Sequence, residues 1–139
     1  MIKVSNKRGF TLIELMVVLF ILGLLAALVA PKMLGRMGES KVKAAKAQIE
    51  LLGTALDSFH LDIGRYPTTQ EGLQALRTAP AGVDAWKGPY LPKDVPNDPW
   101  GRPYQYVCPG NHGDYDLFSL GADNAEGGEG ENQDSESWK

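Results

Sequence analysis

The chain has 139 residues, one cysteine, 22% charged residues and a formal net charge of −3. This length allows one modest domain with an appendage and excludes two full enzyme domains. Residues 1–9 carry three basic and no acidic side chains, residues 31–62 carry five basic and four acidic ones, and residues 63–139 carry six basic and twelve acidic ones. Because phosphates repel a surplus of carboxylates, we expect no nucleic-acid partner.

Residues 10–30 form an apolar run with a single ionisable side chain, Glu14. At about 1.5 Å per residue, a helix of this length spans roughly 32 Å, which matches the hydrocarbon core of a bilayer. Lys3, Lys7 and Arg8 precede the run. The positive-inside tendency therefore predicts a cytoplasmic N-terminus and an extracytoplasmic acidic part.

An ordinary secretory signal is the first alternative to a membrane anchor. The apolar core of such a signal has about 7 to 15 residues and ends at a site with small residues, so this run is too long. A cut after Ala30 is also unfavourable because Leu28 lies at the third position before it and Pro31 follows. We expect no cleavage at this end of the run.

Glu14 has two interpretations. A carboxylate near the start of a membrane helix costs up to a few kcal/mol unless it reaches the headgroups, is protonated or finds a partner. It could be an interfacial glutamate, or it could set the register of assembled helices by pairing with a neighbouring chain's N-terminal amine. The second interpretation requires a cut close to Phe10.

After Pro31, apolar residues recur every three or four positions, which is typical of an amphipathic helix and predicts a helix to about Asp62. This stripe consists of Leu34, Met37, Ala45, Ile49, Leu52, Leu56 and Phe59. Because Pro31 lacks a backbone donor and Gly35 and Gly38 are weak helix formers, residues 31–38 are the expected place for a kink or a melted stretch.

The next segment predicts a short helix over residues 70–78, capped by Thr68 or Thr69, with Leu73 and Leu76 facing inward. Six prolines then mark residues 80–103 as a loop. Three aromatic residues lie between these prolines, Trp86, Tyr90 and Trp100. They predict an ordered loop pinned by aromatic packing.

Two short strands over residues 104–108 and 115–120 follow, joined by a hairpin-type linker over residues 109–113. Asp114 and Asp116 alternate on the second strand, where we expect solvated positions. The elements together predict an α+β fold, in which one long helix packs on a small antiparallel sheet.

The residues Lys7-Arg8-Gly9-Phe10-Thr11-Leu12-Ile13-Glu14 resemble the class III signal of type IV pilins and pseudopilins. The segments RYPTT at 65–69, GLQAL at 72–76 and DPWG at 98–101 are similar to the major pseudopilins of type II secretion systems. The resemblance covers nearly the whole chain and implies a type IV pilin-like fold.

This resemblance implies three segments: a cleaved leader over 1–9, a membrane and filament-core helix over 10–30, and a periplasmic head over 31–139. A prepilin peptidase would cut after Gly9, Phe10 would be N-methylated, and Glu14 would be the acid at the fifth mature position. Removal of the leader leaves eleven basic and seventeen acidic side chains, a net charge of −6.

The resemblance also implies a structural function. The subunit would leave the inner membrane and its lipids for a helical homopolymer in the periplasm. Its partners would be minor pseudopilins, an inner-membrane secretion platform and an outer-membrane secretin, through which filament growth would move folded exoproteins. His60 and His112 fall in no recognisable catalytic motif, so we expect no enzyme.

Residues 120–134 place acidic side chains among glycines. Calcium requires six to eight oxygen ligands, some of them from main-chain carbonyls, whereas a disordered acidic tail is the alternative from composition. Similarity to major pseudopilins implies Ca²⁺ in this loop. The implied ligands are the Leu120 carbonyl, an acid at Asp123 and a second acid at Glu131, with Asp134 and Ser135 as further candidates.

Two other functions remain open on the sequence. A type IV pilin commonly closes its C-terminal region with a disulfide, which the single Cys108 cannot form within the chain. A signal-anchored calcium-binding module would use the helix only as a tether. It predicts an uncut N-terminus and no effect of substitution at Glu14.

Overall fold

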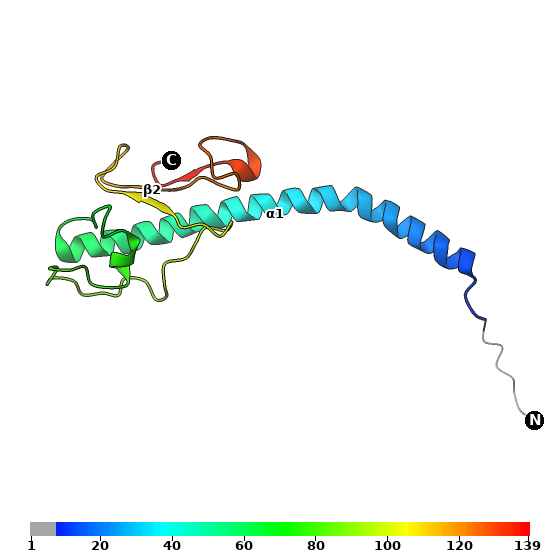
Figure 1. Ribbon diagram of the computed structural model, residues 1–139, viewed down its shortest axis with the longest axis horizontal. Helices are drawn as coiled ribbons and strands as arrows, with labels where there is room; N and C mark the ends of the chain where they lie inside the picture. The colour runs from blue at the N-terminus through cyan, green and yellow to red at the C-terminus, as the bar shows by residue number, and fades with distance from the viewer. Residues whose placement is uncertain (1–7) are drawn as a thin grey trace, which may run out of the picture. The chain divides into compact units, whose positions relative to one another are not determined.

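The computed structural model describes residues 8–139 (Figure 1). The chain divides into two units, residues 1–37 and residues 38–139, which are described separately. The helix α1, Leu12–Ile63, makes up most of the first unit and continues into the second. Its observed end confirms the predicted boundary near Asp62.

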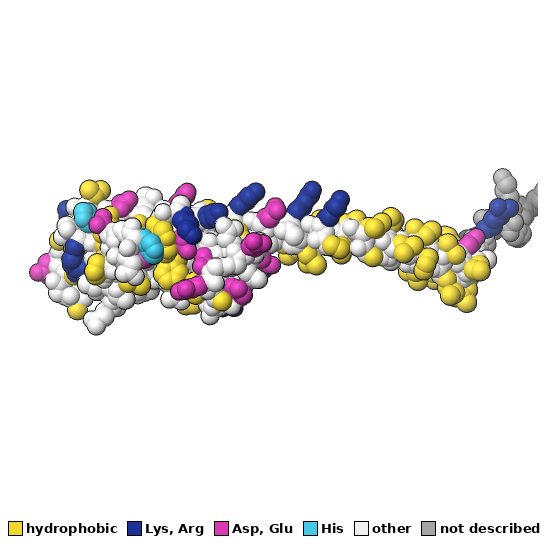
Figure 2. All heavy atoms as spheres, turned by 90° about the horizontal axis from the view of Figure 1, so that it is seen from above, with side chains coloured by type: hydrophobic (Ala, Val, Ile, Leu, Met, Phe, Trp, Pro, Cys, Tyr) yellow, Lys and Arg dark blue, Asp and Glu magenta, His cyan; other side chains and the backbone are white. Residues whose placement is uncertain are grey.

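The first unit is an exposed apolar helix. An 18-residue window of α1 near the N-terminus has a mean hydropathy of 2.9 and no buried residues, so it is long and apolar enough to cross a membrane. Figure 2 shows the apolar surface of this segment in yellow. Residues 31–37 are helical, so the expected melted stretch is not seen in this structure.

The second unit has its core along one face of α1. Ala45, Ile49, Leu52, Leu56 and Phe59 are buried, as the periodicity predicts. Burying such side chains stabilises a fold by about 1.5–3 kcal/mol each for the larger ones. The prediction that the whole stripe packs on a core was wrong at its N-terminal end, because Leu34 and Met37 belong to the first unit and are exposed.

The predicted short helix is a single 3-10 turn, η1, at Leu73–Leu76. Both leucines are buried, as expected. The turn before η1 is held by Thr68 and Glu71: the Glu71 N–H donates to Thr68 Oγ1 over 3.2 Å, and the Thr68 N–H donates to Glu71 Oε1 over 3.0 Å. Arg65 adds two hydrogen bonds to the Glu71 carboxylate.

The Glu71 carboxylate makes the stability of the fold depend on pH. The hydrogen bonds from Arg65 and Thr68 lower its pKa from 4.5 to about 2. A depressed pKa stabilises the fold above the ordinary value, and this contribution is lost as pH falls from about 4.5 to 2. We expect Glu71→Gln to cost about 1 kcal/mol at pH 7, allowing for solvent screening at the exposed Arg65. Thermal melts across pH should show the difference from wild type vanish near pH 2; a constant difference would contradict this explanation.

The Pro-rich loop is ordered by its aromatic residues, as predicted. The Trp86 indole N–H donates to the Ala75 carbonyl over 2.7 Å, and the Tyr90 N–H donates to the Leu76 carbonyl over 2.8 Å. The Tyr90 ring packs edge-on against Phe59 and Trp86. The loop is thereby fixed to η1 and to the helix core.

The antiparallel sheet has the order β1-β2-β3, with β1 at Gln105–Val107, β2 at Asp116–Ser119 and β3 at Ser135–Glu136. The first two strands lie inside the predicted ranges. The third strand was not predicted, because two residues are too few to show an alternating pattern. It pairs Ser135 with Ser119 and brings the acidic loop back to the sheet.

Candidate functional site

The start of α1 is closed by a reciprocal hydrogen-bond pair. The Glu14 N–H donates to Thr11 Oγ1 over 3.2 Å, and the Thr11 N–H donates to Glu14 Oε2 over 3.1 Å. This is a capping box, which satisfies two of the backbone donors left free at a helix start. Its T-x-x-E signal is visible in the sequence at residues 11–14.

The capping box changes the interpretation of Glu14. Its carboxylate already holds the first turn within its own chain, through one of its two oxygens. The other oxygen, Oε1, accepts no hydrogen bond from any residue between 8 and 139. Gly9 and Phe10 lie immediately before the helix, and the Phe10 side chain is 93% exposed. A cut after Gly9 therefore leaves the capped turn intact and places a new amine four residues before Glu14.

The acidic loop at residues 120–134 is folded, which does not fit the alternative of a disordered tail. The Gly127 N–H donates to Asp134 Oδ2 over 2.9 Å, and the Ala122 N–H donates to the Glu131 carbonyl over 3.0 Å. A short 3-10 turn, η2, covers Gly130–Asn132. The Arg102 guanidinium also donates to the carbonyls of residues 121 and 122.

Asp134 is the expected ligand that best fits a cation site. Its Oδ1 atom is buried and has no hydrogen-bond partner among the described residues. Its side chain lines a cavity of about 700 Å³ together with Leu120, Gly127 and Gly128. An unpaired buried carboxylate oxygen is costly to a fold. A cation at this oxygen would remove that cost.

Asp123 and Glu131, the other two acids expected to bind calcium, do not form a metal-binding cluster with Asp134 in the described residues. Asp123 is exposed and accepts the Ala125 N–H. Within residues 8–139, no group of three or more acidic, His or Cys side chains is close enough to hold a metal ion. The structure therefore does not gather Asp123, Glu131 and Asp134 into one cluster.

Glu131 instead ties the loop to the helix. The Trp100 indole N–H donates to Glu131 Oε1 over 3.2 Å, and Lys41 Nζ lies 3.6 Å from the same oxygen. A side chain at Gly38 would come within 3.3 Å of the Glu131 Cβ atom. Glycine at this position of α1 thus gives Glu131 room to approach. Sequence reasoning could not find this contact, because Gly38 and Lys41 on α1 are distant in the chain from both Trp100 and Glu131.

Gly121 is required by the path of the loop. It has φ +75°, and an added Cβ would lie 2.8 Å from the Gln133 carbonyl oxygen. Gly127 has a similar φ of +78°, but nothing lies within 4 Å of its added Cβ. The two glycines separate backbone strain from a steric clash.

We therefore expect Gly121→Ala to destabilise the head by about 2–4 kcal/mol, combining strain and clash. Gly127→Ala carries only the strain and should cost about 1 kcal/mol. Urea unfolding of both variants measures the two costs. Equal losses would show that the contact with Gln133 gives way freely.

The expectation of a solvated Asp116 was wrong. Its side chain is 3% exposed, and its carboxylate accepts the backbone N–H groups of Asn111 and His112 and lies 3.0 Å from His112 Nδ1. Burial opposes the charged form, but the hydrogen bonds from His112 and Asn111 hold the pKa of this carboxyl below its usual range. The His112 ring in turn stacks on Trp138, with 4.1 Å between centroids. Asp116 thereby organises the hairpin linker and the end of the chain.

A second buried carboxylate, Asp98, organises the DPWG segment. It accepts the Ser119 hydroxyl over 2.7 Å and the N–H groups of Trp100 and Arg102. This arrangement aims the Trp100 side chain at Glu131 and positions Arg102 beneath the acidic loop.

A family model described as type II secretion system (T2SS), protein G matches residues 32–138, which include this segment and the loop. A model for the prokaryotic N-terminal methylation motif matches residues 4–30. The chain belongs to the type II secretion system protein G family.

Relatives of known name agree with this membership. The type II secretion system core protein G of Pseudomonas aeruginosa is 50% identical over 137 residues, covering 96% of each chain. That of Vibrio cholerae serotype O1 is 45% identical over 139 residues, covering 98% of this chain and 94% of the relative. The crystal structure of the major pseudopilin from the type 2 secretion system of enterohaemorrhagic Escherichia coli matches with a TM-score of 0.65 and 32% identity, over 78% of this chain and 95% of that one.

Membership of the protein G family confirms the predicted family and the type IV pilin-like α+β fold. The protein is a structural subunit of the type II secretion pseudopilus. Its apolar helix and methylation motif fit a subunit anchored in the inner membrane.

Proposed function

We propose that this pseudopilin enters the inner membrane as a precursor with its N-terminus in the cytoplasm and its head in the periplasm. A prepilin peptidase then cuts after Gly9, and Phe10 is N-methylated. The position of the capping box carries this proposal: helical structure begins just after the cut, and Gly9 and Phe10 are exposed and non-helical. Three basic side chains leave with the leader.

The mature subunits polymerise through their apolar helices. In the membrane, lipid covers the side chains that the first unit exposes; in a periplasmic filament, neighbouring helices replace the lipid. Each Glu14 keeps its own capping bond and uses its remaining oxygen for the N-terminal amine of an adjacent subunit. The pairing of a desolvated carboxylate with one amine fixes the register of the assembly.

The partners in this proposal are minor pseudopilins, the inner-membrane secretion platform and the outer-membrane secretin, through which the growing filament moves folded exoproteins. The role is structural, and polymerisation rather than catalysis is the mechanism.

We further propose that the acidic loop binds Ca²⁺. The oxygen chemistry fits: Asp134 Oδ1 is buried and has no hydrogen-bond partner among residues 8–139, Asp134 shares a cavity with Leu120, and Asp123 lies in the same loop. Calcium prefers such carboxylate and carbonyl oxygens. Glu131 is excluded from this revised donor set, because Trp100 and Lys41 hold its carboxylate. The bound ion would offset repulsion in the loop and fix it against the sheet.

The intact mass and the N-terminal sequence of the membrane-extracted protein test the processing step. We expect loss of residues 1–9 and one added methyl group on Phe10. Gly9→Val should leave the precursor uncut, because a branched side chain replaces the glycine at the cleavage position. Gly23→Val, a change in the same apolar helix, is the matched control and should be processed normally. An uncut Met1 in the wild type would support a tethered head and contradict the filament mechanism.

A further inference from the structure

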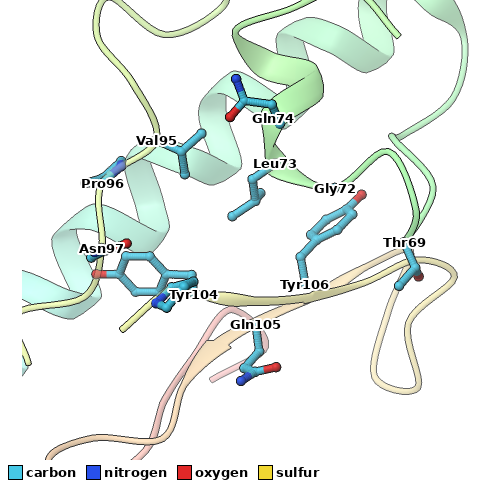
Figure 3. Close-up of a pocket in the computed structure, with 11 residues that line it drawn as sticks. Thr69, Gly72, Leu73, Gln74, Val95, Pro96, Asn97, Tyr104, Gln105 and Tyr106 are labelled. Carbon is cyan, nitrogen blue, oxygen red and sulfur yellow. The ribbon is translucent and has the colours of Figure 1, made fainter. Parts of the chain in front are cut away.

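A groove runs along the outer edge of β1, under η1 and beside the Pro-rich loop (Figure 3). Its volume is about 440 Å³. None of the residues that line it is charged, although the chain carries a net charge of −3. We name it the β1 groove, and its lining includes Thr69, Leu73, Val95, Asn97, Tyr104 and Tyr106.

The register of the sheet shows which backbone groups face this groove. Tyr106 is paired with Leu117. The Leu117 N–H donates to Ser137 Oγ, and its carbonyl accepts the Ser137 N–H, so both groups point toward β3. In an antiparallel pair of strands, when the N–H and carbonyl of one residue point away from the other strand, those of the residue directly opposite also point away. The N–H and carbonyl of Tyr106 therefore point outward, to the free edge of β1.

A second contact agrees with this direction. Cys108 lies two residues further along and faces the same edge. There Thr69 Oγ1 accepts the Cys108 N–H over 2.9 Å and donates to the Cys108 carbonyl over 3.1 Å. One hydroxyl thus takes the place of a neighbouring strand at this end of the groove.

The opposite end of the edge is closed by the Pro-rich loop. Asn97 forms a bridge with Pro103, and the Asp98 N–H donates to the Arg102 carbonyl over 2.7 Å. Between these two ends, no residue among 8–139 makes a hydrogen bond to the N–H or carbonyl of Tyr106. The edge is therefore open at Tyr106, and Figure 3 shows the Leu73 side chain between those of Tyr104 and Tyr106 in the groove.

We propose that the β1 groove binds an extended, uncharged peptide segment of a partner protein as a fourth strand. One residue of that segment would exchange two hydrogen bonds with Tyr106, which is the pairing of β-strand addition. The strand β1 between the two closed ends has three residues, Gln105–Val107, which matches a bound segment of about 10 Å. Leu73 and Val95 provide apolar contacts for side chains of the bound segment. This inference stands apart from leader cleavage and calcium, since neither contributes to the groove.

The test uses the full chain in detergent micelles and the peptide acetyl-Thr-Val-Thr-Val-Thr-amide. We expect saturable shifts of the Tyr106 amide signal in NMR spectra and slower hydrogen exchange at that amide. A strand presents alternate N–H groups to its neighbour. Methylating the threonine nitrogens or, separately, the valine nitrogens should therefore abolish binding for one set and spare it for the other. The analogue with lysine in place of both valines should bind at least about tenfold more weakly.

Val95→Lys places a charge in the groove and should weaken peptide binding at least about tenfold. Val107→Lys is the matched control: it makes the same change on β1 outside the groove and should bind normally. The pattern of the methylated peptides keeps the test valid if Val95→Lys unfolds. No saturable shift at Tyr106, equal loss with both methylated sets, or equal binding of the lysine peptide would overturn the proposal.

Discussion

Glu14→Leu is expected to abolish filament assembly while the subunit stays in the membrane. The leucine side chain is more apolar than a carboxylate, so insertion of the helix becomes easier. The variant loses both the bond to the Thr11 N–H and the charge available to a neighbouring amine. Crosslinking between subunits in membranes measures assembly, and resistance of the protein to alkaline extraction measures insertion. We expect crosslinked multimers to fall at least about tenfold, a loss of 1.4 kcal/mol or more per contact.

Glu14→Gln separates the two roles of the side chain. The glutamine carbonyl can still accept the Thr11 N–H, but the side chain carries no charge. If pairing with an amine sets the register, Glu14→Gln should lose filament assembly to the same extent as Glu14→Leu. Thr11→Val is the matched control, because it removes the hydroxyl acceptor of the capping box and keeps the carboxylate. It should assemble with only the loss of helix-start stability, about 1 kcal/mol. Normal assembly of Glu14→Gln would show that the carboxylate acts only as a cap.

Features that depend on local pattern were predictable from the sequence. The end of α1, the buried leucines of η1 and the aromatic anchoring of the Pro-rich loop follow from periodicity and residue type within short segments. The capping box at Thr11 and Glu14 belongs to the same class, since its signal occupies four consecutive residues. The role of Glu14 within one chain, as a cap on the first turn of α1, was therefore predictable from the sequence.

Contacts between distant segments were not predictable in this way. Glu131 was expected to bind calcium because the resemblance to major pseudopilins implies a second acidic ligand at this place in the loop. Its position beside Trp100 and Lys41 depends on how the loop folds back. Asp116 was expected in solvent because strands at an edge alternate. The hairpin linker instead folds over its carboxylate. In both cases the partner donors, and not the acid itself, decide the role of the carboxylate.

Calcium is expected to raise the thermal stability of the head through Asp134 and not through Glu131. In the full chain in micelles, calcium in excess should raise the melting temperature of the head relative to chelator. A ligand at one hundred times its dissociation constant stabilises the folded state by about 2.7 kcal/mol. For a head of this size that is a rise of about 10 °C or more.

Asp134→Asn and Asp123→Asn should each lose most of this rise, because an amide is a weaker calcium ligand than a carboxylate. In chelator, Asp134→Asn should be no less stable than wild type, because the amide oxygen can still accept the Gly127 N–H in place of Oδ2, and the neutral amide NH2 replaces the charged Oδ1 that has no partner among residues 8–139. The loop variants thus lose stability only where calcium is present.

Glu131→Gln is the decisive comparison. Its contacts with Trp100 and Lys41 exist without any ion, so the variant should melt at a lower temperature in both buffers and keep the full calcium-dependent rise. Loss of the rise in Glu131→Gln would return this residue to the ligand set, and would mean that calcium draws its carboxylate away from the helix. A rise that persists in Asp134→Asn would remove Asp134 from the site. Because each acid contributes either to the ion or to the helix contact, the two buffers distinguish the roles without a structure of the bound form.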